Sequence, residues 1–380
     1  MTTTNVTPVG TANGAPTSPT PQRLTSLDAL RGFDMFWIIG ADALVHALHR
    51  ASEARPIRFV AGQMEHVAWE GFRFYDLIFP LFVFIVGVSL VFSLGRLIEQ
   101  KGRVAAIQRV VRRAVLLYLL GIFYYGGFAT PFERIRLLGV LQRIALCYLF
   151  AGLTFCWLGN RGRVVVAVSL LVGYWALMTF VPVPGVGAGG FAPGQNLANW
   201  IDQHYLPLRK WDGAYDPEGL LSTLPAIATC LLGVFAGTVL QKRGIGESQK
   251  AALFALAGVV LAAAGWAWGI QFPVIKKIWT SSYVLVAGGY SLLLLAAFHW
   301  IVEVRGWRAW AQPFVWIGMN PITIYLLNQI VDLEAVARRF VGLPSKWFGR
   351  GDELVVAIAA MAINFALCRF LYRRKIFLRF

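Results

Sequence analysis

Long apolar segments are the feature that most constrains how this chain folds. About ten stretches of the 380-residue sequence approach the ~20 apolar residues that a membrane-crossing helix needs. The short alternating segments that would build a membrane β-barrel are not visible. We therefore predict an all-α, polytopic membrane protein. The spans are predicted at Leu27–Leu48, Leu77–Leu94, Val110–Phe123, Leu137–Leu158, Val164–Val181, Leu220–Leu240, Ala251–Ile270, Tyr283–Ile301, Pro313–Val331 and Leu354–Leu371.

Composition agrees with a membrane fold and argues against a soluble one. Hydrophobic residues make up 57% of the chain and charged residues 14%, with a mean hydropathy of +0.61. Soluble domains usually carry about 25% charged residues. A soluble fold of this size could not hide so much apolar surface in one core. The lipid bilayer is therefore the first expected partner.

The basic residues sit beside the spans, which argues against nucleic acid as a partner despite the formal charge of +16. Three clusters fall on one side of the membrane if the chain crosses about ten times. The positive-inside rule makes that side cytoplasmic, so both termini are predicted to be cytoplasmic. The clusters are Arg96, Lys101, Arg103, Arg109, Arg112 and Arg113; Lys242, Arg243 and Lys250; and Arg373, Arg374, Lys375 and Arg379.

One membrane domain, residues 23–380, accounts for nearly all of the chain. Residues 1–22 are rich in Thr, Pro and Gly and lack the apolar core of a signal peptide, so we expect a disordered cytoplasmic tail. The four cysteines lie inside predicted spans without CxxC spacing. That placement indicates neither disulfides nor a metal site.

Two long loops are predicted on the outer side, at residues 50–75 and 182–219. The second mixes aromatic residues with carboxylates, and Trp211 and Glu218 are examples. Such a mixture suits sugar binding. It also suits an aromatic belt at the membrane interface, and composition does not decide between the two.

The first span carries an unusual number of polar residues on one face. Ionisable residues within a span are costly and are therefore candidates for function. Asp28 and Arg31 are read as a structural i,i+3 pair near the cytoplasmic edge. Asp42 is different, because it lies about 21 Å further along the helix axis, near the outer end. At helical spacing, an arc of about 120° holds Asp28, Arg31, Asp34, Asp42, His46 and His49.

His66 lies just before the second span, on the predicted outer side. A single loop histidine is most often a polar surface residue. This one adjoins the polar face of the first span, and Asp76 marks the entrance to the next helix. A neutral imidazole is the side chain best suited to accept a proton near neutral pH. We expect Asp42 to orient it, as the carboxylate does in a catalytic triad.

Cations within or beside the spans need anionic partners. Arg136 and Arg143 fall on nearly the same face of the fourth span. Each requires a carboxylate, such as Asp76, or an anionic ligand such as a phosphate. Lys276 and Lys277 are expected either to reach the membrane interface or to meet a phosphate.

The ninth span is predicted to break after Asn320, because Pro321 cannot continue the helix. Backbone groups freed there must be satisfied by protein or by a water-lined cavity. No pattern of an NTPase, a zinc protease or a serine hydrolase is present. From the residues alone, an enzyme and a transporter both remain open.

Six ordered stretches resemble the heparan-α-glucosaminide N-acetyltransferase family and its bacterial relatives. They cover most of the chain from Arg23 to about Gln329. The stretches are RLTSLDALRGFDMFW, EHVAWEGFRFYDLIFPLFVFIVGVSL, RIRLLGVLQRIALCY, YDPEGLLSTLPAIATCLLGVFAG, KKIWTSSYVL and IGMNPITIY.

The resemblance implies a transmembrane acyltransferase domain that moves an acetyl group from acetyl-CoA to the amino group of a sugar on the non-cytoplasmic side. His66 matches the family's essential histidine. Asp42 stands where the family has an asparagine. An ionised aspartate only accepts hydrogen bonds, whereas an asparagine also donates to a developing oxyanion. Both direct attack by the amine and an acetyl-histidine intermediate fit this site.

The resemblance also directs the remaining assignments. Acetyl-CoA is expected as the acyl donor, and no metal is expected. The expected location is the bacterial inner membrane. Alternatives are a transporter of a sugar or small polar solute, or a membrane O-acyltransferase. The sequence leaves open whether copies of the chain form a homo-oligomer. Candidates for holding CoA are Arg31, Arg136, Arg143 and Lys277, and those for holding the glycan acceptor are Asp76, Trp211, Glu218 and Asn320.

Overall fold

A computed structural model describes residues 24–377, and the predicted tail at residues 1–22 lies outside them. Helices dominate these residues, and the only β pairing among them is two isolated bridges. The all-α prediction is confirmed. The first part of the fold comprises α1 (Thr25–Phe36), the π-helix η1 (Trp37–Ala41), α2 (Asp42–Ala51), α3 (Arg55–Gln63), α4 (Phe74–Tyr124), the 3-10 turns η2 (Gly127–Ala129) and η3 (Phe132–Arg134), α5 (Val140–Trp157) and α6 (Asn160–Phe180).

The second part continues the bundle and ends in helices that pack beside α1 and α2. It comprises α7 (Leu197–Tyr205), α8 (Thr223–Gln241), α9 (Glu247–Gly269), α10 (Ser281–His299), the π-helix η4 (Trp300–Val304), α11 (Gln312–Gly318), α12 (Pro321–Ile330), α13 (Leu333–Ser345), the 3-10 helix η5 (Lys346–Gly351) and α14 (Asp352–Arg373).

Seven helices among the described residues are long and apolar enough to cross a membrane, so the expected count of about ten is not confirmed. The difference arises where predicted spans are joined or divided. The second and third predicted spans both lie in the single helix α4. This helix turns back at Gly102, where φ is 81° and glycine is favoured. The first span is divided by η1, where Gly40 has φ 133°. The ninth is divided into α11 and α12, with α12 beginning at Pro321 as predicted.

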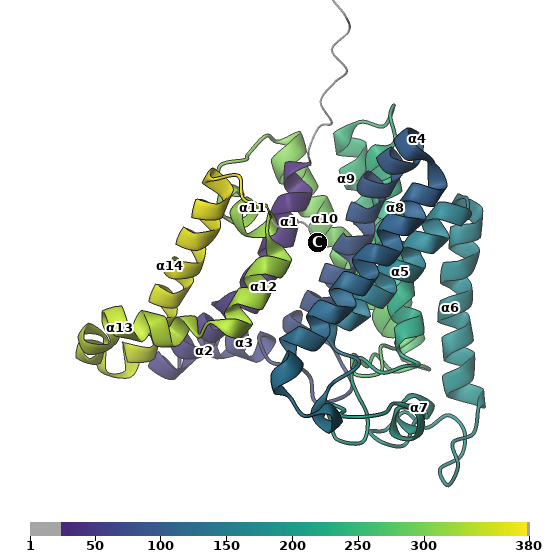
Figure 1. The fold of residues 1–380 in the computed structure, drawn as a ribbon, viewed down its shortest axis with the longest axis horizontal. Coiled ribbons are helices and arrows are strands. Elements are labelled where there is room, and N and C mark those ends of the chain that lie inside the picture. Colours follow the sequence, from purple (N-terminus) through teal and green to yellow (C-terminus); the bar gives the residue numbers. More distant parts are fainter. Residues whose placement is uncertain (1–23, 378–380) are drawn as a thin grey trace, which may run out of the picture.

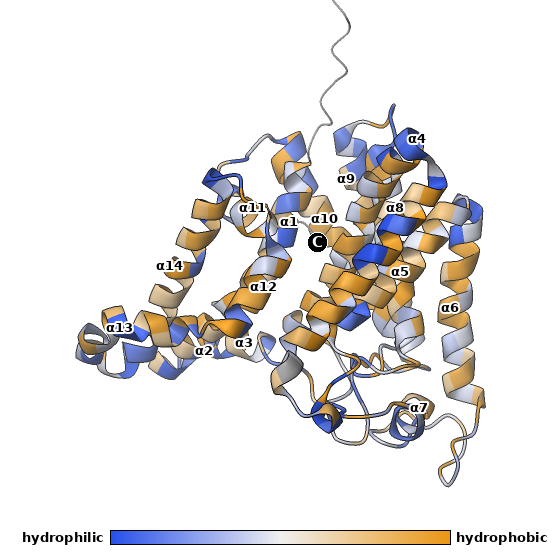
Figure 2. Cartoon of the chain, in the orientation of Figure 1, coloured by the Kyte–Doolittle hydropathy of each residue, from blue (hydrophilic) through white to orange (hydrophobic). Residues whose placement is uncertain are grey.

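The two ends of the bundle differ (Figure 1). α1 begins, α14 ends, and the turns at Gly102 and between α8 and α9 lie at the upper end in this view. The short helices α2, α3, α7 and α13 lie at the lower end. Apolar residues dominate the helices between these ends (Figure 2). The two long predicted loops therefore share one end of the molecule, and each contains a short helix.

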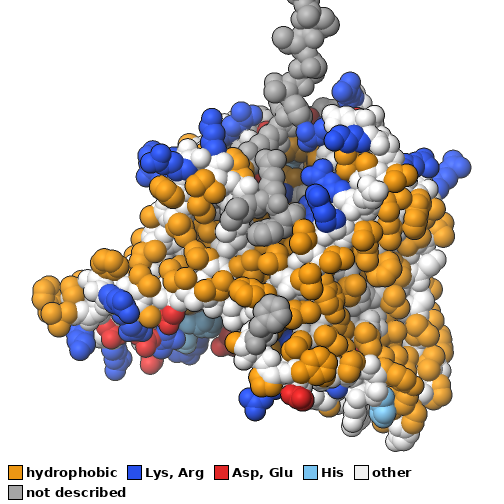
Figure 3. Space-filling view, viewed as in Figure 1, with side chains coloured by type: hydrophobic (Ala, Val, Ile, Leu, Met, Phe, Trp, Pro, Cys, Tyr) orange, Lys and Arg blue, Asp and Glu red, His pale blue; other side chains and the backbone are white. Residues whose placement is uncertain are grey.

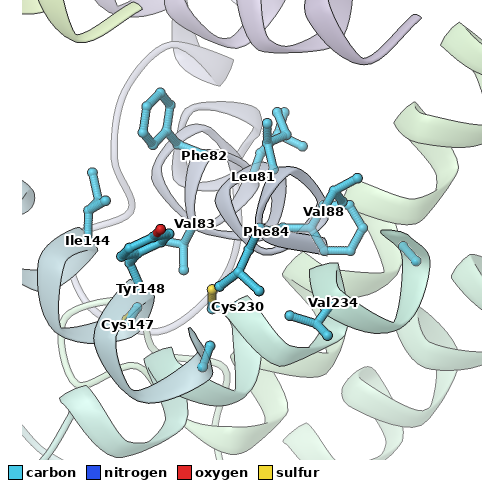
Figure 4. Close-up of a cluster of buried hydrophobic side chains, with 14 of the residues drawn as sticks. Leu81, Phe82, Val83, Phe84, Val88, Ile144, Cys147, Tyr148, Cys230 and Val234 are labelled. Atoms are coloured by element: carbon cyan, nitrogen blue, oxygen red, sulfur yellow. The ribbon is translucent and has the colours of Figure 1, made fainter. Parts of the chain in front are cut away.

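The core lies where α4, α5 and α8 pack together. Figure 4 shows Phe84 and Val88 of α4 close to Cys230 and Val234 of α8, with Tyr148 of α5 beside them. All of these side chains are buried. This packing holds α4 in the bundle, and the first turn of α4 carries Tyr75 and Asp76 of the site described next.

Candidate active site

A cavity of about 1100 Å³ opens between the start of α4, the end of α4 and α12. Its walls also include the segments at residues 66–69, 209–218 and 276–279. This volume lies slightly above the range for small-molecule sites, which is about 300–1000 Å³. Charged and aromatic side chains line it, among them His66, Tyr75, Asp76, Arg136, Arg209, Trp211, Asp212, Glu218, Lys276 and Lys277.

His66 pairs with a buried carboxylate on the wall of this cavity. Its Nδ1 lies 2.8 Å from Oδ1 of Asp76. The Asp76 side chain is fully buried, whereas about half of the His66 side chain, 51%, is exposed. With Nδ1–H donating to the carboxylate, Nε2 carries the lone pair of the ring. Nε2 is then the atom able to accept a proton from a ligand in the cavity.

The first turn of α4 explains why Asp76 is positioned so firmly. Its Oδ2 accepts hydrogen bonds from the backbone N–H of Arg73 at 3.1 Å and of Val67 at 3.3 Å. The backbone carbonyl of Asp76 accepts a hydrogen bond from the hydroxyl of Tyr283 at 2.8 Å. One carboxylate therefore caps the helix, folds the preceding loop back onto it and holds the imidazole.

Asp42 does not take the position that we expected beside His66. Its Oδ2 accepts a hydrogen bond from the Tyr75 hydroxyl at 3.0 Å. The Tyr75 ring lies against the imidazole, with ring centroids 4.9 Å apart. Asp42 thus reaches His66 only through Tyr75, and the carboxylate on the imidazole is Asp76. The division of the first span at η1 precedes Asp42 directly, so simple helical spacing does not predict its direction.

Lys276 completes the group around the imidazole. Its Nζ lies 3.0 Å from Nδ1 and 3.4 Å from Nε2 of His66. It is also 3.4 Å from Oδ1 of Asp76. Burial lowers the pKa of Lys276, and the carboxylates of Asp76 and Glu218 oppose that shift. From the sequence, Lys276 was expected either to reach the membrane interface or to meet a phosphate, and only its neighbour Lys277 was a candidate for holding CoA.

Arg136 is held by the acidic loop before α8. Its Nε donates to Asp216 at 2.8 Å, and its terminal nitrogen contacts Glu218. The guanidinium also lies over the rings of Tyr125 and Trp211, at 4.7 and 4.9 Å from their centroids. Burial raises the pKa of Glu218, and Arg136 opposes this. The sequence did not single out Asp216 or Tyr125, because their contacts with Arg136 depend on how separate segments fold together.

Of the other residues predicted to bind the cofactor or the substrate, some line the cavity and some do not. Lys277 lines the cavity and pairs with Asp212 at 2.7 Å. Three predicted residues lie outside the cavity walls. Arg143 is buried against Ser222 and Trp279, Arg31 donates to Ser89 at 2.6 Å, and Asn320 donates to the Ile376 carbonyl at 2.9 Å. Among the described residues no cluster of His, Cys, Asp and Glu could hold a metal ion.

Comparison with known proteins identifies the family. Residues 23–267 match the family described as "Heparan-alpha-glucosaminide N-acetyltransferase, catalytic". The chain belongs to this family. It is also similar to curated proteins named heparan-alpha-glucosaminide N-acetyltransferase, being 25% identical to the mouse protein over 82% of this chain and 25% identical to the human protein over 95%.

The matched region contains most of the site but not all of it. The chain spans 56% of the mouse protein and 60% of the human one, so it covers less than two thirds of these relatives. His66, Asp76 and Arg136 lie within the family match, whereas Lys276 and Lys277 follow its end at residue 267.

Proposed function

We propose that this chain is an integral membrane N-acetyltransferase. In this proposal an acetyl group moves from acetyl-CoA to the amine of an amino sugar or related envelope glycan on the non-cytoplasmic side. The observation that carries it is the His66–Asp76 pair, 2.8 Å apart, on the wall of a cavity of about 1100 Å³ in a chain of this family. A transporter does not require an oriented histidine, whereas acyl transfer to an amine requires a base.

The proposed reaction is acyl transfer from a thioester. The amine nitrogen attacks the thioester carbon, and Nε2 of His66 takes the proton that this nitrogen must lose. The tetrahedral intermediate then collapses, the carbon–sulfur bond breaks, and the thiolate of CoA leaves and is protonated. Asp76 orients the imidazole and stabilises the imidazolium that forms. The same geometry also allows Nε2 to accept the acetyl group first and pass it to the amine.

Charge and shape suggest where the two substrates bind. The guanidinium of Arg209 and the ammonium of Lys277 lie on the cavity wall and remain partly exposed, which suits the phosphates of CoA. Trp211 is 56% exposed on the cavity wall, and an aromatic side chain there suits contact with a sugar. We place the acceptor there, with Glu218 near its amino group. Arg136 then serves mainly to hold the acidic loop.

The test is acetyl transfer by purified protein in lipid nanodiscs with acetyl-labelled acetyl-CoA. We expect labelled product with glucosamine and other amino sugars but none with glucose, and product formation by the His66→Ala variant that is lower by on the order of 10² or more. Transfer to glucose as well as glucosamine would indicate an O-acyltransferase. Uptake of sugar into vesicles without thioester cleavage would indicate a transporter and would overturn the proposal.

A further inference from the structure

The side chain of Lys276 is far less exposed than the imidazole it contacts. Only 17% of it is exposed, compared with 51% for His66. Its Nζ is within 3.4 Å of both imidazole nitrogens and of the Asp76 carboxylate. A lysine that only reached for the membrane interface would keep its ammonium in water. This ammonium instead points at the base.

The backbone around Lys276 is fixed on both sides. Glu70 and Ile275 form an antiparallel bridge, and the Gly71 N–H donates to the Val274 carbonyl at 2.9 Å. The Thr280 hydroxyl accepts from the Ile275 N–H at 3.1 Å. Ile275 is itself buried, with 1% exposed. The loop that carries His66 and the turn that carries Lys276 are therefore joined through their backbones.

Two positive charges cannot share this site at low cost. Nδ1–H donates to Asp76, so a proton added to His66 must go to Nε2, and the imidazole then becomes a cation. An ammonium 3.4 Å from Nε2 repels that second charge. Asp76 attracts it. Lys276 and Asp76 thus act on a charged imidazole in opposite directions.

The remaining charged groups nearby are largely paired. Glu65 accepts from Arg73 at 3.0 Å on the outer side of the loop, and Lys277 is paired with Asp212. Glu218 lies across the cavity and favours the charged form of Lys276. Tyr75 covers the imidazole with its ring, and its hydroxyl points to Asp42.

We propose that Lys276 is a positioning residue for the base, whose ammonium keeps His66 neutral at rest and free to accept a proton at Nε2. The role of a neutral His66 in catalysis rests on the proposed function. The effect of the Lys276 charge on the imidazole does not depend on catalysis and can be measured by itself.

The first experiment compares three variants in nanodiscs by the pH dependence of kcat/KM for acetyl transfer. Lys276→Gln removes the charge, so protonation of the base becomes easier. We expect the acid-side midpoint to move to higher pH by about one unit. Lys276→Arg retains the charge and should keep the midpoint near that of the wild type. Arg73→Gln is the matched control, because it removes a charge from the loop before α4 that is paired with Glu65, and its midpoint should also stay.

The second experiment does not require activity. Diethylpyrocarbonate modifies unprotonated imidazole, and mass spectrometry of the peptide containing His66 follows that modification at each pH. The midpoint for Lys276→Gln should again lie about one unit above that of the wild type. An unchanged or lower midpoint would overturn the role of Lys276. If the wild type transfers no acetyl group while the modification midpoint still moves, the proposed function fails and the charge effect stands.

Discussion

His66 is the side chain on which the proposed chemistry depends most directly. It lies in the loop before α4 with half of its surface exposed, so its contribution to helix packing is small. We predict that His66→Ala lowers kcat by on the order of 10² or more, the loss expected when a general base or nucleophile is removed. Thermal unfolding of the purified variant should remain close to that of the wild type.

His46→Ala and His49→Ala are the matched histidine controls. Both residues belong to α2 and neither lines the large cavity. Each should retain acetyl transfer within about tenfold of the wild type. Loss of transfer in His46→Ala together with normal transfer in His66→Ala would mean that the wrong histidine has been assigned.

Asp76 and Asp42 allow the same substitution to be compared at two carboxylates. Asp76→Asn replaces the acceptor on Nδ1 and weakens the bonds to Val67 and Arg73, so we predict a loss of about 10²–10⁴ in kcat. Asp42→Asn leaves a carbonyl that can still accept from Tyr75, so activity should fall less than tenfold. Steady-state kinetics of both variants measure the two losses in kcat. A larger loss for Asp42→Asn than for Asp76→Asn would make Asp42 the carboxylate of the reaction.

The sequence identifies the candidate site residues better than it identifies their partners. His66 and Asp76 are both recognisable, but their contact depends on a loop that folds back onto the first turn of α4. Lys276 reaches His66 from 210 residues away along the chain. No periodicity of a single helix reports such a contact. The expected Asp42 pairing was wrong because the break at η1 changes the direction of the helix that follows.

At the scale of elements, close contact between α4 and α8 holds the first turn of α4 in place. A Cβ added at Gly233 would lie 1.9 Å from the Phe84 carbonyl oxygen, so Gly233→Ala must push these helices apart. We predict a destabilisation of about 1–3 kcal/mol, seen as a lower Tm in detergent. Gly173→Ala in α6 is the control, because an added Cβ there meets nothing within 4 Å. Its Tm should be unchanged or higher, and an equal loss in both variants would rule out the steric explanation.

Uninterrupted apolar segments were the most predictable elements. α5, α6, α8, α9, α10 and α14 begin and end within a few residues of the predicted spans. The interrupted segments were not predictable from hydropathy. The π-helix at Trp37–Ala41 is itself made of apolar residues, so it leaves no gap in the hydropathy pattern. The short amphipathic helices α3, α7 and α13 were also missed, since their length is below that of a span. Those helices lie at the same end of the molecule as the cavity walls at residues 66–69 and 209–218.

For the whole molecule, the distribution of charge indicates an orientation. Lys and Arg side chains gather along the upper edge in Figure 3, whereas acidic and basic side chains mix at the lower left. The upper edge is the end at which α1 begins and α8 turns into α9. If that end is cytoplasmic, as the positive-inside rule expects, the loops beside the cavity face the opposite side.

Labelling from one side of the membrane tests this orientation. Ala214 lies in an exposed loop at the cavity end, and Ser248 is exposed in the first turn of α9 at the other end. We predict that Ala214→Cys reacts with an impermeant maleimide in intact cells, and that Ser248→Cys reacts only after the membrane is permeabilised. The four native cysteines are buried, so they compete little for the reagent. The opposite labelling pattern would show that the protein has the reverse orientation. The cavity would then face the cytoplasm, and acetyl transfer would occur on the same side of the membrane as the cytoplasmic acetyl-CoA.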